Sequence, residues 1–204
     1  TNIDLNAAVK NMEHFTELKE LYIGPASVAR IKSDEFISSL MGHIPDLFVL
    51  HLSQLSGLVD DDLCEVLKHA VALHDFYVSF IDFGWKMAGA LSSCLPNLIK
   101  LSLVGSKTFV DADLRCICGS MTNLSVLILA ACPRISDAGF SRCLLLSKLY
   151  HLEVRELGVP FTGACLSYFP QSPLKILKFE KLCGLRNLDN AYDLSCQIRD
   201  GIKN

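Results

Sequence analysis

The chain has 204 residues, half of them hydrophobic and a fifth charged, so it can bury a continuous core and does not have the composition of a disordered protein. Its formal net charge is -3 at pH 7, and its Lys and Arg residues form no run that could follow a phosphate backbone, which argues against a nucleic-acid partner. No apolar stretch approaches the roughly 20 residues that a membrane-spanning helix needs, so we expect no membrane partner.

An apolar frame of the form L-x-x-L-x-L, with substitutions, recurs seven times along the chain. In chain order its copies are Leu18-Leu21-Ile23, Leu47-Leu50-Leu52, Leu73-Phe76-Val78, Leu98-Leu101-Leu103, Leu124-Leu127-Leu129, Leu149-Leu152-Val154 and Leu174-Leu177-Phe179. Successive copies begin 29, 26, 25, 26, 25 and 25 residues apart. A fixed period in this range is typical of a solenoid, in which each unit buries its apolar face only by stacking on its neighbours.

The repeats predict a single domain over residues 1–204, with about seven units at 15–182. A partial repeat at 1–14 and a closing segment at 183–204 flank them, because the frame weakens at both ends of a stack. The chain begins with Thr1 rather than Met, so we expect it to be a piece of a longer protein.

The unit over residues 123–147 has the most regular pattern. Its three leucines predict a short strand, and Asp137 stands where its carboxylate would cap the start of a helix. Phe140 and Cys143 would form the apolar face of that helix. The last strand residue precedes the first helix anchor by eleven residues in three units, namely Leu52 to Leu63, Leu103 to Leu114 and Leu129 to Phe140.

This unit resembles the cysteine-containing subtype of leucine-rich repeat. The matching residues are Leu124, Leu127, Leu129, Cys132, Ile135, Asp137, Gly139 and Phe140. The subtype is best known from the substrate-receptor regions of F-box proteins and from related mitotic-exit antagonists. The resemblance implies an α/β leucine-rich repeat solenoid, a right-handed horseshoe segment with a parallel sheet inside and helices outside. It also implies protein recognition, as the substrate-binding or adaptor region of a ubiquitin-ligase receptor.

The nine cysteines are odd in number and spread along the repeats, which favours buried, reduced thiols over a disulfide framework. We therefore expect an intracellular protein, cytoplasmic or nuclear.

The sequence contains none of the patterns that carry catalysis or metal binding. It has no glycine-rich phosphate loop and no cysteine pair of the zinc type, and its histidines have no partners at ligand spacing. The aspartates at 60–62, 111 and 113 open predicted helices, where capping explains them. We expect no enzymatic activity, no cofactor and no metal.

The residues between the strand leucines should face outward on the concave side of the solenoid. The candidate protein-binding residues on this face are Glu20, Tyr22, His51, Asp75, Tyr77, Lys100, Ile128, His151, Glu153, Arg155 and Lys178. Tyr22, His51 and Tyr77 share the middle column on successive strands, and we expect them near the centre of the interface. We also expect Val126, Ile128 and Ala130 to form an exposed apolar patch. The occupant of the face is a protein partner or another domain of the parent chain.

Two other functions fit the same repeats. One is a sensor or autoinhibitory region of a larger protein, such as a nucleotide-binding innate immune receptor, and the other is a small organellar assembly factor. The residues upstream of Thr1 would discriminate among the three: an F-box, a P-loop ATPase, or an Arg- and Ser-rich targeting segment respectively.

Overall fold

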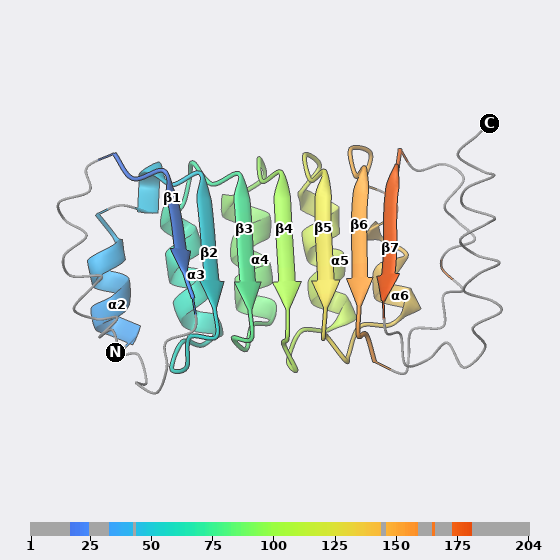
Figure 1. Cartoon of the computed structure of the whole chain (residues 1–204), viewed down its shortest axis with the longest axis horizontal. Coiled ribbons are helices and arrows are strands. Elements are labelled where there is room, and N and C mark those ends of the chain that lie inside the picture. The colour runs from blue at the N-terminus through green and yellow to red at the C-terminus, as the bar shows by residue number, and fades with distance from the viewer. Residues whose placement is uncertain are drawn as a thin grey trace.

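The computed structural model describes residues 17–24, 33–42, 44–143, 146–158, 165 and 173–180. The architecture is α/β, with one seven-stranded, all-parallel sheet whose strands lie in chain order (Figure 1). The strands are β1 (Glu20–Ile23), β2 (Val49–Ser53), β3 (Asp75–Ser79), β4 (Lys100–Val104), β5 (Val126–Ala130), β6 (His151–Arg155) and β7 (Ile176–Glu180). One strand falls on each of the seven apolar frames, which confirms the parallel sheet predicted from the period.

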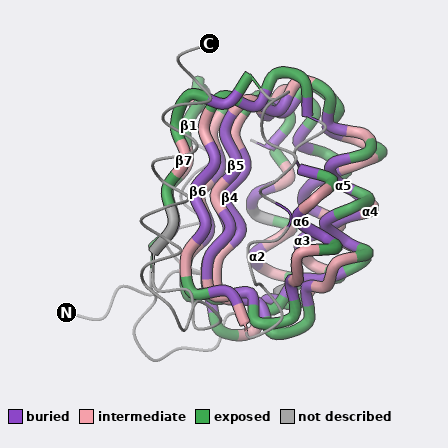
Figure 2. Tube along the Cα trace, turned by 90° about the vertical axis from the view of Figure 1, so that its right-hand side faces the viewer, coloured by how far each residue is buried: buried purple, intermediate pink, exposed green. Residues whose placement is uncertain are grey.

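The helices pack against one face of this sheet and leave the other face without a described helix (Figure 2). They are α2 (Ser33–Leu40), the short 3-10 helix η2 (Ile44–Asp46), α3 (Asp60–His69), α4 (Trp85–Cys94), α5 (Asp111–Ser120) and α6 (Asp137–Phe140). We call the face that bears no described helix the open face. Because consecutive units lie side by side, each unit packs mainly on the one before and the one after it.

The core is continuous from the first described unit to the last. The inward residues of β2 to β6, such as Leu50 and Leu127, are buried and form one cluster with helix anchors such as Leu114, while Leu21 of β1 and Leu177 of β7 are partly buried. In the most regular unit, the predicted burial of Cys132 and Phe140 is confirmed. Helix α6, however, is shorter than the sequence predicts, because it ends at Phe140.

Cys143 is buried but lies beyond the end of α6 rather than on its apolar face. The helix contains Gly139 and is followed by Ser141 at its C-cap, and both residue types have lower helix propensity than alanine or leucine.

The helix starts are capped by carboxylates in two alternating ways. In α3 and α5 the third helix residue reaches back to its own helix: Asp62 accepts from Val59 N at 2.8 Å, and Asp113 accepts from Val110 N at 2.9 Å. These contacts are the carboxylate half of a capping box.

In α4 and α6 a carboxylate of the preceding unit accepts hydrogen bonds from N–H groups at the helix start. Asp60, at the start of α3, accepts from the N–H groups of Gly84 at 2.8 Å, Lys86 at 3.0 Å and Met87 at 3.1 Å. Asp111, at the start of α5, accepts from Ser136 N at 2.8 Å. The third residues of α4 and α6 are Met87 and Gly139, which carry no carboxylate of their own.

Asp137, expected to cap α6, is the first residue of this helix rather than its N-cap. The N-cap is Ser136, whose hydroxyl accepts from Ala138 N. The Asp137 carboxylate also accepts from Cys165 N of the next unit, at 3.5 Å. Adjacent helix starts lie side by side in the stack, so a side chain on one helix can reach the free N–H groups of its neighbour.

The same geometry explains Gly139. A Cβ atom at this position would collide with the Asp111 carboxylate and lie 2.9 Å from the Asp111 Cα. The glycine of the repeat motif thus makes room for the capping aspartate of the preceding unit.

The predicted partial repeat at 1–14 and the closing segment at 183–204 lie outside the described residues. Within the part of the chain that is described, no helix combines the length and the apolar character that crossing a membrane requires.

Candidate functional site

The strand register places the middle column of predicted residues in one row across the open face. Its members are Tyr22, His51, Tyr77, Ser102, Ile128, Glu153 and Lys178, each directly opposite the next. A second row contains Glu20, Asp75, Lys100 and His151, and Arg155 lies in a third. All eleven residues selected from the sequence therefore lie on this face.

Three rings stand in contact at the β1 end of the face. The ring centroids of Tyr22 and His51 are 5.9 Å apart, and those of His51 and Tyr77 are 5.6 Å apart. The Tyr22 side chain is 61% exposed, although a ring of its size normally gains free energy by burial. The row is thus an ordered, solvent-accessible aromatic surface, and we call it the ring row.

Both tyrosines of the ring row remain neutral phenols at physiological pH. The Tyr22 hydroxyl donates to Glu20 Oε2 at 3.1 Å, and this hydrogen bond raises the pKa of Tyr22. Desolvation, with a smaller contribution from Asp75, raises the pKa of Tyr77. The Tyr77 hydroxyl and the His51 ring nitrogens form no hydrogen bond with any described residue, so they can bond to a partner.

A second pair of rings lies where the strands begin, at the edge of the same region. The centroids of Phe48 and His74 are 5.1 Å apart, and Lys19 Nζ lies 5.6 Å from the Phe48 ring. His74 Nδ1 lies 2.7 Å from the Ala72 carbonyl, which can only accept, so the proton of the neutral ring sits on Nδ1. Sequence reasoning missed this pair because it considered only positions within the strands.

The sequence nonetheless contains a pattern that indicates the ring and apolar residues at this edge. The residue directly after the first leucine of each frame occupies it, and four of these residues are aromatic, imidazole or apolar: Phe48, His74, Ile99 and Tyr150. Phe48, Ile99 and Tyr150 are all exposed.

The β6–β7 end of the open face carries charged residues of both signs. Glu153, only 9% exposed, lies between Arg155 Nε at 2.9 Å, Lys178 Nζ at 3.6 Å and His151 Nε2 at 3.7 Å. Arg155 Nε is buried without a hydrogen bond, so its contact with Glu153 is an ion pair of poor alignment. Glu180 lies opposite Arg155 in the strand register, so two permanently basic residues and two acidic residues share this end of the face.

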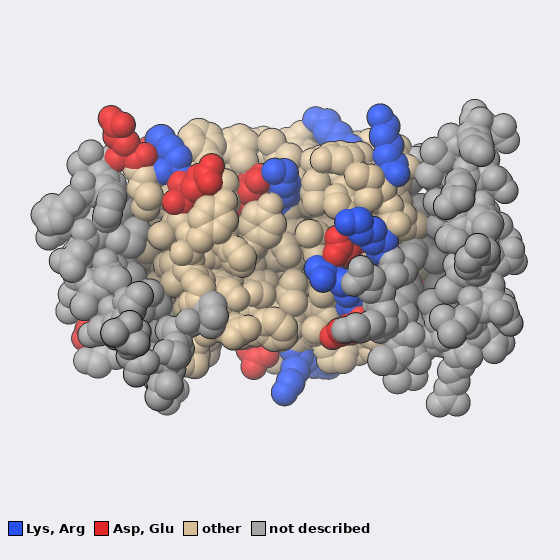
Figure 3. Space-filling view, viewed as in Figure 1, with Lys and Arg blue, Asp and Glu red and all other residues tan. Residues whose placement is uncertain are grey.

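The centre of the face is uncharged. Figure 3 shows this view, with charged side chains near the rim and over β6–β7 and a broad area without charge between them. Nearer the rim, Lys100 Nζ donates to Asp75 at 2.8 Å, and this hydrogen bond raises the pKa of Lys100. The opposite charges of Lys100 and Asp75 therefore cancel.

The predicted apolar patch on β5 is wrong in its exposure. Val126 is 7% exposed and Ala130 is 6% exposed, while Ile128 between them is half-buried. Val126 lies between Lys100 and His151, and longer side chains on strands about 4.8 Å away shield a shorter one.

The cysteines whose side chains are described all carry free thiols. Burial raises the pKa of Cys132 to about 11. Burial and a 3.3 Å contact with Cys118 raise the pKa of Cys143 well above its usual value. Cys116, by contrast, is exposed. Cys183 and Cys196 lie outside the described residues.

We therefore expect iodoacetamide at pH 8 to label Cys116 readily and Cys132 and Cys143 only after unfolding. At a pKa near 11, only about one Cys132 thiol in a thousand is the reactive thiolate at this pH. Mass spectrometry with and without guanidinium measures the difference. Equal labelling rates for Cys116 and Cys132 in the folded protein would contradict the burial.

Within the described residues, no group of three or more His, Cys, Asp or Glu side chains is placed to share a metal ion. The open face offers hydrogen-bonding groups, rings and charged side chains. No protein-family model matches this chain, and no curated protein shows a significant match to it.

Proposed function

We propose that this chain is a leucine-rich repeat domain that recognises a protein partner through its open face, without enzymatic activity of its own. The observation that supports recognition most directly is the ring row, in which Tyr22, His51 and Tyr77 contact one another in order, with Tyr22 exposed and the other two half-buried. Tyrosine is enriched at interface hot spots because it brings a large, rigid, amphipathic surface at low entropic cost.

Support for the repeat class comes from the sheet and the motif together. Seven parallel strands follow one another in chain order, and the glycine of the cysteine-type motif has a steric role at Gly139. Within that class, the motif at 123–147 favours the substrate-binding region of a ubiquitin-ligase receptor.

The distribution of charged residues on the open face limits which side chains a partner can place against it. The β1–β3 end presents the ring row, whereas the β6–β7 end presents Arg155 and Lys178 beside Glu153. A complementary partner places apolar or aromatic side chains on the first end and charged or hydrogen-bonding groups on the second. Adjacent parallel strands are about 4.8 Å apart, so the β3 and β6 positions are separated by about 14 Å.

The test begins by placing a photo-crosslinking phenylalanine analogue at Tyr77 and, as the control, at Lys68 on the exposed side of α3. A protein that crosslinks only through position 77 is then purified, and its affinity for the chain without the crosslinker is measured by calorimetry. Tyr77→Ala should weaken binding at least tenfold, about 1.4 kcal/mol, because a truncated central tyrosine loses both area and its hydroxyl.

Lys68→Ala should change neither affinity nor stability, since its ion pair with Glu65 is exposed. If Tyr22→Ala, His51→Ala and Tyr77→Ala all bind like wild type, the open face is not the recognition surface. The ubiquitin-ligase assignment has its own test: the full-length parent protein, isolated under native conditions, should bring down a cullin. Failure to recover one removes that assignment and leaves partner recognition standing.

A further inference from the structure

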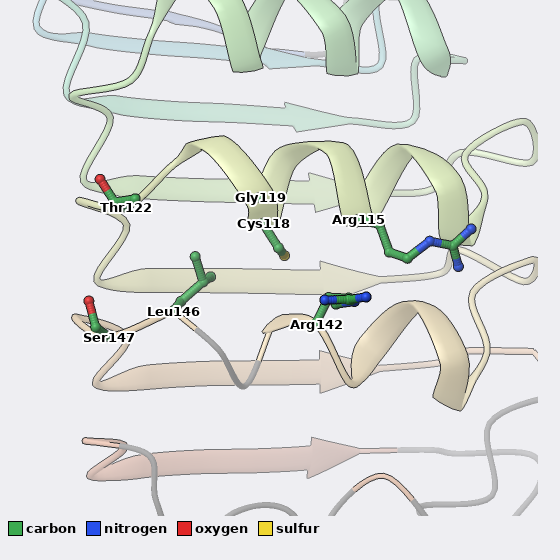
Figure 4. A pocket seen from close by; sticks show the side chains of 7 residues that line it. All are labelled: Arg115, Cys118, Gly119, Thr122, Arg142, Leu146 and Ser147. Carbon is green, nitrogen blue, oxygen red and sulfur yellow. The ribbon is translucent and has the colours of Figure 1, made fainter.

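A hollow of about 390 Å³ lies on the helical side of the molecule, away from the open face (Figure 4). It lies between α5 and the segment that follows α6 in the next unit. The residues that line it are Arg115, Cys118, Gly119, Thr122, Arg142, Leu146 and Ser147. Its volume falls in the range of about 300–1,000 Å³ that small-molecule sites occupy.

Two arginines from neighbouring units line one end of this hollow. Arg115 comes from α5 and Arg142 follows α6, and in Figure 4 both lie at the end of the hollow away from Thr122 and Ser147. Neither guanidinium forms an ion pair or a hydrogen bond with any residue that the structure describes. Both groups are permanently charged, so two cations line one site with no described counter-charge.

The rest of the hollow is uncharged and mixed in character. Leu146 and the Cys118 thiol provide an apolar wall, and the hydroxyls of Thr122 and Ser147 stand at the end opposite the guanidiniums. The last turn of α5, whose free carbonyl groups carry partial negative charge, is also at the hydroxyl end. An anion is therefore favoured at the arginine end and disfavoured at the other.

We propose that this hollow binds a phosphomonoester. Arg115 and Arg142 hold the phosphate, and the organic group lies along Cys118 and Leu146 toward the hydroxyls. A phosphomonoester carries a charge of about -1.5 to -2 at pH 7, which two guanidiniums balance, whereas one carboxylate would leave a cation unpaired. The guanidinium fork also matches phosphate oxygens in bidentate geometry. The phosphate comes either from a phosphorylated side chain of a partner or from a phosphorylated small molecule.

The test uses calorimetry on the 204-residue chain with two probes: phenyl phosphate, and a phosphoserine peptide beside its unphosphorylated twin. Saturable binding of a phosphorylated probe is expected, and Arg115→Ala and Arg142→Ala should each weaken it at least about tenfold. The matched control is Arg134→Ala, an exposed arginine that does not line the hollow. A peptide that binds tighter than phenyl phosphate identifies a protein source, and the reverse order identifies a small molecule.

Cys118 provides a second readout because it lines the hollow, whereas Cys116 on the same helix does not. The bound probe should slow alkylation of Cys118 at least about threefold and leave Cys116 unchanged. Two results would overturn the proposal: no saturable binding of either phosphorylated probe up to about 10 mM, or equal affinities for wild type and both arginine variants. Thermal melts of the variants, whose replaced side chains are exposed, verify that each is folded.

Discussion

Leu127→Asp should abolish cooperative folding of the chain. Leu127 is fully buried in the middle of β5, where its neighbours across the register are Leu101 and Leu152. An aspartate here has no described cation to pair with and must either desolvate its charge or take up a proton. The cost, more than about 4 kcal/mol, is a large part of the 5–15 kcal/mol by which a domain is stable.

The matched control is Ile128→Asn, one residue along the same strand. Ile128 is half-buried on the open face, so a polar side chain there remains in contact with water and should cost about 1 kcal/mol or less. Circular dichroism during urea titration measures both variants. A Leu127→Asp protein with a wild-type unfolding curve would show that Leu127 does not face the core and that the strand register is wrong.

The strands were predictable because their pattern is both local and periodic. In Leu124-x-x-Leu127-x-Leu129 the alternation fixes which face each side chain takes, and the constant period places the next strand beside it. The row Tyr22, His51 and Tyr77 follows from this register without knowledge of any contact. Most of the candidate site could therefore be located from sequence.

What the sequence did not reveal depends on packing between units. The exposure of Val126 and Ala130 depends on the lengths of the side chains on the two adjacent strands. The residue pattern of a single strand contains no information about those neighbouring side chains. The hollow beside Arg115 lies between α5 and the segment that follows α6, and weak propensity alone does not locate a helix end to within a few residues. Both features belong to the interface between repeats.

The capping aspartates illustrate the same limit most clearly. Asp60 has the sequence context of a residue at its own helix start, and that is how the sequence was interpreted. In the structure its carboxylate serves the helix of the next unit. Whether an aspartate caps its own helix or the next one can be seen in the sequence only by comparing units. Helices α3 and α5 have an aspartate at their third position, whereas α4 and α6 have none.

Asp60→Ala should destabilise the chain by about 2–3 kcal/mol, because the three N–H groups that it caps at the start of α4 lose a charged acceptor. Those groups are partly buried, so water replaces the carboxylate incompletely. Asp60→Asn keeps the shape and one acceptor oxygen but not the charge that favours a helix N-terminus, and it should fall between Ala and wild type.

Asp61→Ala separates capping from surface charge. Asp61 is the next residue in the same first turn, but its side chain is 67% exposed and its described contact is an ion pair with Lys86. Losing it should cost between about 0 and 1 kcal/mol. Urea unfolding of the three variants at one ionic strength measures the series, and 1 M salt should reduce the Asp61 effect more than the Asp60 effect, because exposed pairs are screened. Equal losses for Asp60→Ala and Asp61→Ala would show that the carboxylate of Asp60 does not join the two units.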